Sequence, residues 1–141
     1  MKLTANEVRL GNYYFYHIVD KYDERGEYDE VCQIDAEDFR ILENFDCPEY
    51  KPIPLDNLWL RDFDFVKEGR SWFMGVHEGI FSGLIKLTYN KTLNTWIFSI
   101  GKYRNITMIK YVHHLQNVFF ALTYQELKRK HENKRTDKGE N

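Results

Sequence analysis

The feature that most constrains the fold is a block of three aromatic and β-branched runs between residues 70 and 102. The runs are "RSWFMGVHEG", "FSGLIKLTYN" and "NTWIFSIGK", and the turn-forming segments "HEG" and "NKTLN" separate them. In the second run, Ile85, Leu87 and Tyr89 alternate with Lys86 and Thr88, which is the period-2 pattern of a half-buried strand. Connections this short do not allow a parallel crossover. We therefore expect antiparallel strands here, and "YRNITMIK" adds a fourth short strand.

The N-terminal third shows a second strand pattern. An aromatic and β-branched run covers residues 13–19, a polar segment with Gly26 near its middle follows, and "EVCQID" returns. This predicts an antiparallel pair joined by a hairpin-like turn. The next segment, "AEDFRILEN", fits either a helical turn or a third strand, and we favour a strand for "FRILE".

The middle of the chain is marked by Pro48, Pro52 and Pro54, which cannot donate ladder hydrogen bonds. The segment "KPIP" is therefore expected to be an extended linker. Directly after it, Leu55, Leu58, Trp59 and Phe63 repeat at helical spacing, which predicts a short central helix.

A closing helix is expected to begin between residues 107 and 110. At 100° per residue, one apolar stripe forms on this helix. Its members are Val112, Leu115, Phe119 and Leu122, whereas Lys110, His114, Asn117 and Ala121 fall on the opposite side and should face water. Thr123 and Glu126 have capping-box spacing, so a second short helix is predicted at "TYQEL".

These elements predict one α+β domain over residues 1–127. Its antiparallel sheet of about five to seven strands is covered on one face by the C-terminal helix and the short central helix. Residues 128–141 contain no apolar side chain, so we expect a disordered charged tail there.

Three polar residues interrupt the closing helix. Adjacent His113 and His114 point about 100° apart and cannot chelate one ion together. We expect His114 in solvent and His113 as a half-buried ring hydrogen-bonded to a backbone carbonyl. Gln116 lies at the rim of the apolar stripe and must be hydrogen-bonded. We interpret His113 and Gln116 as structural polar residues, with Gln116 tying the helix to a strand edge or loop backbone. The alternative is an amide that binds a partner or ligand.

Charge is strongly segregated along the chain. Residues 20–49 contain twelve acids and three bases, whereas residues 79–125 contain five bases and no acid. Such a basic, aromatic segment could bind a single-stranded nucleic acid. Its candidate residues are Lys86, Lys91, Trp96, Lys102 and Arg104. Five bases over 47 residues are sparse, however, and the formal net charge is −2.

Several functional classes lack their sequence motifs. GxxxxGK, GxGxxG and GxSxG are absent, the two cysteines do not form CxxC, and no finger-like spacing of Cys or His predicts zinc. We assign no catalytic, cofactor-binding or metal-binding residue, and expect no enzyme activity and no cofactor. No segment has the length of a membrane span, and the N-terminus lacks an apolar signal region. These patterns predict a cytoplasmic protein without membrane contact.

Three stretches resemble a family of small uncharacterised proteins of gut bacteria, their phages and mobile elements. "NEVRLGNYY" is similar to that family's "ELRIGNYV", "KPIPLDNLWLRDFDF" to "PIPLTEEWLLKFGF", and "IKYVHHLQNVFFALTYQEL" to "IKYVHQLQNLYFALTGEEL". The chain departs from this pattern at Asp64 and Tyr124, where the family tends to have glycine. The resemblance implies an accessory protein of a phage or mobile element, and brings no activity or cofactor with it.

The leading functional hypothesis is a non-enzymatic binding module that interacts with a protein partner. The alternative is a nucleic-acid-binding accessory protein that uses residues 79–125. A small enzyme is the third hypothesis, and it requires His17, His77 or His113 in a concave pocket beside carboxylates with perturbed pKa values.

Overall fold

The protein has an α+β fold with two antiparallel sheets, seen in a computed structural model that describes residues 2–77, 83–101 and 105–130. The chain divides into two compact units. Unit 1 comprises residues 1–54 and 111–117, and unit 2 comprises residues 55–110 and 118–141. The predicted α+β class and antiparallel pairing are confirmed, and the strands lie in two sheets.

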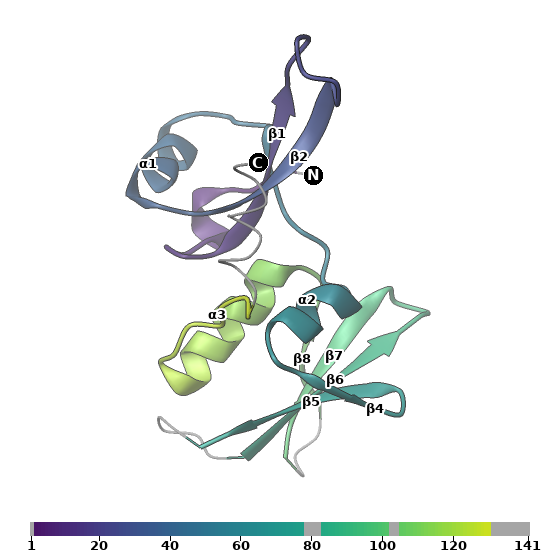
Figure 1. Ribbon diagram of the computed structural model, residues 1–141. Coiled ribbons are helices and arrows are strands. Elements are labelled where there is room, and N and C mark those ends of the chain that lie inside the picture. Colours follow the sequence, from purple (N-terminus) through teal and green to yellow (C-terminus); the bar gives the residue numbers. More distant parts are fainter. Residues whose placement is uncertain (1, 78–82, 102–104, 131–141) are drawn as a thin grey trace. The chain divides into compact units, whose positions relative to one another are not determined.

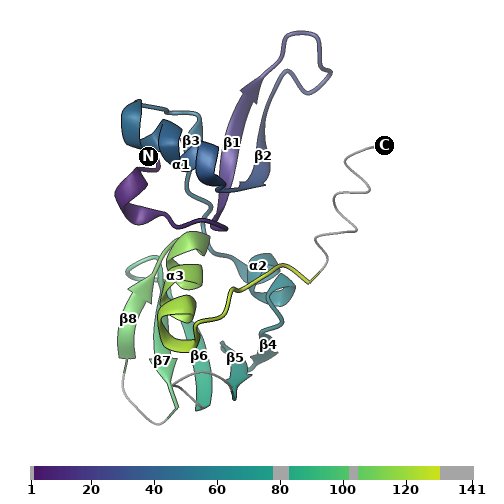
Figure 2. The same ribbon diagram turned by 90° about the vertical axis from the view of Figure 1, so that its left-hand side faces the viewer.

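Unit 1 contains a three-stranded sheet. Its strands are β1 (Tyr13–Val19), β2 (Glu27–Gln33) and β3 (Tyr50–Lys51), in the antiparallel order β2-β1-β3. Figure 2 shows β1 and β2 side by side up to their connecting turn. Gly26 ends that turn with a φ of 65°, a left-handed conformation that glycine adopts without strain. The predicted hairpin is confirmed. The "KPIP" segment is not wholly linker, because Lys51 belongs to β3.

The strand prediction at residues 39–43 is wrong. These residues belong to helix α1 (Ala36–Asn44), which begins at a reciprocal capping box. The Asp35 carboxylate accepts from Asp38 N at 2.8 Å, and the Asp38 carboxylate accepts from Asp35 N at 3.0 Å. The two bonds satisfy donors that are otherwise unpaired at a helix start. The spacing of these two aspartates was the overlooked signal.

The core of unit 1 lies between its sheet, α1 and the short 3-10 helix η1 (Ala5–Glu7). Its buried apolar residues are Leu3, Val8, Tyr14, Ile34, Leu42 and Tyr50. The rings of Tyr14 and Tyr50 stack with centroids 4.9 Å apart. Aromatic burial of this kind supplies much of the driving force available to a small sheet.

Unit 2 contains a five-stranded antiparallel meander in the order β4-β5-β6-β7-β8 (Figure 1). The strands are β4 (Val66–Glu68), β5 (Ser71–Val76), β6 (Gly83–Asn90), β7 (Thr95–Ile100) and β8 (Asn105–Ile109). The three strands expected between residues 70 and 102 and the fourth in "YRNITMIK" are confirmed. One face buries Ile85, Leu87 and Phe98, each with 0% of its surface exposed.

The predicted short central helix is α2 (Asn57–Asp62), which is N-capped by Asp56. Its last turn closes through two backbone bonds. Asp64 N donates to Arg61 O and Phe65 N donates to Leu60 O, both at 3.0 Å. This Schellman motif places Asp64 at a φ of 69°, a conformation that favours glycine.

The closing helix is α3 (Val112–Thr123), and it begins later than predicted because residues 105–109 form β8. Val112, Leu115 and Phe119 of the predicted stripe are buried, and Leu122 is partly buried. Tyr124 follows at a φ of 60°, with its N–H donating to Phe120 O. The helix predicted at residues 123–127 is absent, because the Thr123 hydroxyl accepts from Gln125 N in a turn instead. None of the helices in the described ranges is long and apolar enough to span a membrane.

The predicted charged tail begins within the described residues. Lys130 N donates to Asp62 O at 2.6 Å, and Arg129 Nε lies 3.7 Å from the Asp62 carboxylate. Residues 131–141, the remainder of that prediction, lie outside the described residues.

Candidate functional site

The two faces of the five-stranded sheet differ in burial. Residues that pair in register lie on the same face, and the register pairs Val66 with Phe73, Phe73 with Lys86, and Ile97 with Met108. These residues alternate with the buried set that includes Ile85, Leu87 and Phe98. We call the side opposite the buried set the outer face. It includes Val66, Glu68, Ser71, Phe73, Leu84, Lys86, Thr88, Ile97, Ile106 and Met108.

Apolar side chains on the outer face reach solvent. The exposed fractions are 67% for Val66, 45% for Leu84, 53% for Ile106 and 58% for Met108. Exposed single apolar residues are ordinary, but several on one sheet face form a patch of the kind that marks an interaction surface. Within the described part of unit 2, these four side chains are therefore left uncovered.

Three cations accompany this patch. Lys86 lies on the outer face, between Phe73 and Ser99 in register. Arg70 and Lys91 line a concavity of about 640 Å³ at the end of β6 and β7. Within the described ranges, none of the three side chains has a hydrogen bond, an ion pair or a ring contact. Arg70 was not among the residues proposed from sequence, because it lies outside the acid-free segment.

The cations of unit 1 behave differently. Arg25 pairs with Asp23 at 2.9 Å, Arg40 with Glu37 at 2.6 Å, and Lys2 with Asp46. Two arginines within the acid-rich segment and one lysine outside it therefore pair with its carboxylates. The unpaired cations of unit 2 remain available to an external anion.

The residues predicted to bind nucleic acid have different environments. Lys86 and Lys91 are exposed. Trp96 is 6% exposed, and its indole N–H donates to Leu55 O at 2.9 Å, so its ring belongs to the core and cannot stack on a base. Lys102 and Arg104 lie outside the described residues. Trp96 is therefore not available to bind nucleic acid.

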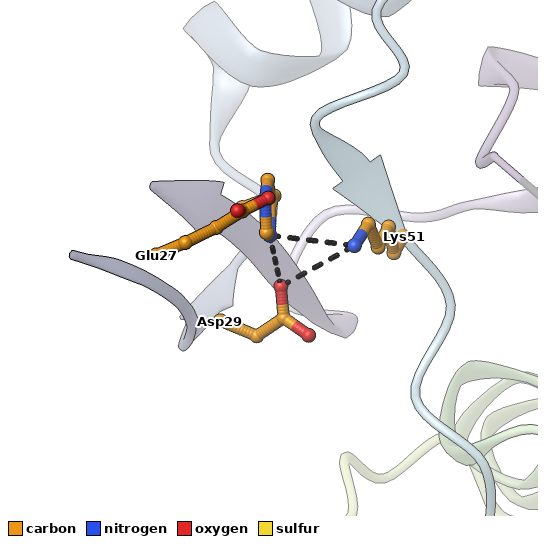
Figure 3. Close-up of polar contacts among 4 residues, drawn as sticks. Glu27, Asp29 and Lys51 are labelled. Atoms are coloured by element: carbon orange, nitrogen blue, oxygen red, sulfur yellow. Dashed lines mark hydrogen bonds and ion pairs between the residues drawn. The ribbon is translucent and has the colours of Figure 1, made fainter. Parts of the chain in front are cut away.

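A histidine–carboxylate cluster lies on the sheet of unit 1. His17 Nδ1 is 2.7 Å from an Asp29 carboxylate oxygen, and His17 Nε2 is 2.6 Å from a Glu27 carboxylate oxygen. Lys51 Nζ lies 3.5 Å from the same Asp29 oxygen, and Figure 3 shows the amine of Lys51 pointing toward the carboxylate of Asp29. Strand register explains the contact, because His17 of β1 pairs directly with Asp29 of β2.

Electrostatics in this cluster favour a charged ring. The hydrogen bonds to Asp29 and Glu27 raise the pKa of His17, and the hydrogen bond from His17 lowers the pKa of Asp29. These two contacts favour a ring protonated on both nitrogens, a form that has no free lone pair with which to accept a proton. None of these residues lines the Arg70–Lys91 concavity. The described residues contain no group of three or more His, Cys, Asp or Glu side chains arranged to hold a metal ion.

Gln116 is fully buried and bonded to backbone on both sides of its amide. Tyr13 N donates to Gln116 Oε1 at 2.8 Å, and Gln116 Nε2 donates to Gly11 O at 3.2 Å. The side chain therefore links α3 to the start of β1. The expectation that neighbouring Asn117 faces water is wrong, since its amide donates to Glu7 O and accepts from Asn12.

The expectation for His113 is also wrong. The ring is 0% exposed rather than half-buried, and within the described residues neither nitrogen has a hydrogen bond. Its Nε2 lies 3.3 Å from Glu7 Oε1 without hydrogen-bond geometry. Burial and the neighbouring His114 lower the pKa of His113 to about 3, so the ring is neutral at pH 7 and the contact is not an ion pair. His114 is half-buried rather than in solvent, and burial lowers its pKa also.

No protein-family model, curated protein or solved structure matches this chain. Its function is therefore inferred from the geometry of its own residues.

Proposed function

We propose that this protein is a non-enzymatic interaction module that binds a protein partner through the outer face of its five-stranded sheet. One observation carries the proposal. Exposed Val66, Leu84, Ile106 and Met108 share that face with the unpaired cation Lys86. An uncovered apolar sheet face is a common form of protein-binding surface.

The chemistry of the face favours a protein over a nucleic acid. Single-stranded nucleic acids are held largely by stacking of bases on aromatic rings. The exposed side chains here are aliphatic or methionine, and the aromatic Phe73 is partly buried. Aliphatic and methionine side chains pack well against apolar protein side chains and offer bases no stacking surface.

The charge of the face specifies the partner further. Lys86, Arg70 and Lys91 lack anionic partners within the described part of the chain. A complementary partner carries apolar side chains with acidic residues beside them. The setting implied by the family resemblance, that of a phage or mobile element, is part of this proposal.

The test compares partner capture by two variants with matched exposure. Met108 is 58% exposed on the outer face, and Leu58 is 60% exposed on α2. Cells that produce the protein are crosslinked, and recovered partners are identified and then titrated as purified proteins. We expect Met108→Asp to abolish binding of the purified partner and Leu58→Asp to leave it unchanged. Equal binding by both variants would contradict the proposal.

Nucleic-acid binding is the second candidate, supported by the unpaired cations. Its test is the affinity for a single-stranded DNA oligonucleotide as a function of salt. Affinity that falls steeply with salt, and falls again when Lys86 and Lys102 are neutralised, would place this function first. Under the leading proposal the oligonucleotide binds weakly and without saturation.

A further inference from the structure

The concavity between the end of β6 and the start of β7 has a mostly apolar lining that also carries hydrogen-bond donors. Arg70 and Lys91 supply the charged donors, and Ile97 supplies the apolar side. Its remaining lining residues are Thr88, Tyr89 and Asn90. At about 640 Å³ the volume is in the range of small-ligand sites.

The neutral polar groups of the concavity are also arranged as donors. The Ser71 and Thr88 hydroxyls share one hydrogen bond of 2.7 Å. Two hydroxyls have two protons, so one proton remains to donate elsewhere. Asn90 Oδ1 already accepts from Leu93 N at 3.1 Å, which leaves the amide NH₂ as the group that can face a ligand.

No carboxylate lines this concavity. Strands β6 and β7 belong to the acid-free segment from residue 79 to residue 125, whereas Glu68 of β4 lies two residues from Arg70 and pairs in register with Ser71. A guanidinium, an ammonium and neutral donors suit a phosphate-type oxyanion, which accepts several hydrogen bonds at once.

We propose that this concavity binds a small phosphorylated organic ligand. Arg70 and Lys91 hold the phosphate oxygens, Thr88 and Asn90 donate to them, and Ile97 contacts the apolar part of the ligand. The concavity shares Thr88 and Ile97 with the outer face, whereas Met108 and Lys86 do not line it, so different substitutions test the two proposals.

The test is a titration of the ¹⁵N-labelled protein with phenyl phosphate, followed by NMR. We expect saturable shifts of the amides of residues 88–91 and weaker binding of inorganic phosphate, which lacks the apolar group. Arg70→Gln and Lys91→Gln should each weaken phenyl phosphate binding about tenfold, the effect of losing a charged hydrogen bond. The control is Lys67→Gln, an exposed lysine on adjacent β4 outside the concavity, which should bind as the unaltered protein does.

Three results would overturn the proposal. The first is shifts that stay linear in ligand concentration. The second is equal weakening by Lys67→Gln and Arg70→Gln, which would show unspecific charge attraction. The third is displacement of phenyl phosphate by a much lower concentration of single-stranded DNA, which would assign the site to nucleic acid.

Discussion

Gln116 and His113 are both fully buried in α3, yet their polar atoms differ in hydrogen bonding. The Gln116 amide bonds to the backbone of Tyr13 and Gly11, whereas the His113 nitrogens have no hydrogen bond within the described residues. A satisfied buried amide specifies one position for the helix, and an unsatisfied imidazole destabilises the fold. Substitution of Gln116 and the pH dependence of stability due to His113 test these two assignments.

Truncation of Gln116 to Ala should lower the free energy of unfolding by about 1–3 kcal/mol, because the Tyr13 N–H loses its buried acceptor, while the Gly11 C=O keeps Gln33 as a donor. Gln33→Ala is the matched control. Gln33 donates to the same Gly11 oxygen at 3.1 Å but is exposed, so its loss should cost below about 1 kcal/mol. Urea denaturation measures both, and an unchanged midpoint for Gln116→Ala would reopen its role as a binding amide.

Acid should destabilise the protein through His113. The folded-state pKa of about 3 lies below the unfolded value of about 6.5, so the unfolded state binds the proton first as the pH falls. Stability due to this residue is present above pH ~6.5 and is lost below it, by up to about 1.4 kcal/mol per pH unit. The groups that face the ring are Glu7, His114 and Tyr111.

His17 acts in the opposite direction. Its raised pKa means that its contribution is present below the unfolded value and is lost as the pH rises through the folded value. Urea midpoints between pH 5 and 7 should therefore fall less steeply toward acid in His113→Leu than in the unaltered protein. Exposed His77→Gln serves as control. Identical slopes for all three proteins would remove His113 as the cause.

At the scale of elements, helices α2 and α3 are each followed by a residue with left-handed backbone conformation that is not glycine. These residues are Asp64 after α2 and Tyr124 after α3. A C-terminal cap of this geometry favours glycine because a Cβ is strained there.

Asp64→Gly should therefore stabilise the protein by about 1 kcal/mol, and Asp64→Ala should destabilise it by a similar amount. Both variants lose the exposed contact between Asp64 and Lys130, so that contribution cancels in the comparison. Thermal unfolding of the pair gives the difference directly. A higher melting temperature for Asp64→Ala than for Asp64→Gly would show that the cap geometry is wrong.

At the scale of the whole molecule, α3 belongs to both units, with residues 112–117 in unit 1 and residues 118–123 in unit 2. Unit 1 is consequently discontinuous in sequence. Residues 1–54 depend on the distant segment for the Gln116 bonds and for the bond from Val112 N to Ile53 O at 2.8 Å.

A fragment of residues 1–54 should not fold alone. Without residues 111–117, Tyr13 N loses its Gln116 acceptor, Asn12 Nδ2 loses its Asn117 acceptor, and Gly11 O keeps the exposed Gln33 but loses Gln116. We expect collapsed amide dispersion in its NMR spectrum and well-dispersed signals from the same residues in the full chain. A dispersed fragment spectrum would show that unit 1 is autonomous.

The sequence by itself determined the local elements of this protein. Alternation in β6, the turn at Gly26 and the apolar stripe of α3 are short-range patterns, and each was readable before the structure. Helix α1 is also encoded locally, in the Asp35–Asp38 capping box. The α+β class follows from these elements.

Only the tertiary structure decided which side chains are exposed and unpaired, and so able to bind a ligand or partner. Trp96 is suited to stacking by residue type, yet it is buried and its indole N–H bonds to Leu55 O. His113 is likewise fully buried, and the pairing of β5 with β6 brings Arg70 to the same concavity as Lys91. Burial and pairing depend on residues far apart in sequence, whereas periodicity depends on near neighbours. The elements could therefore be predicted, and the candidate binding surface could not.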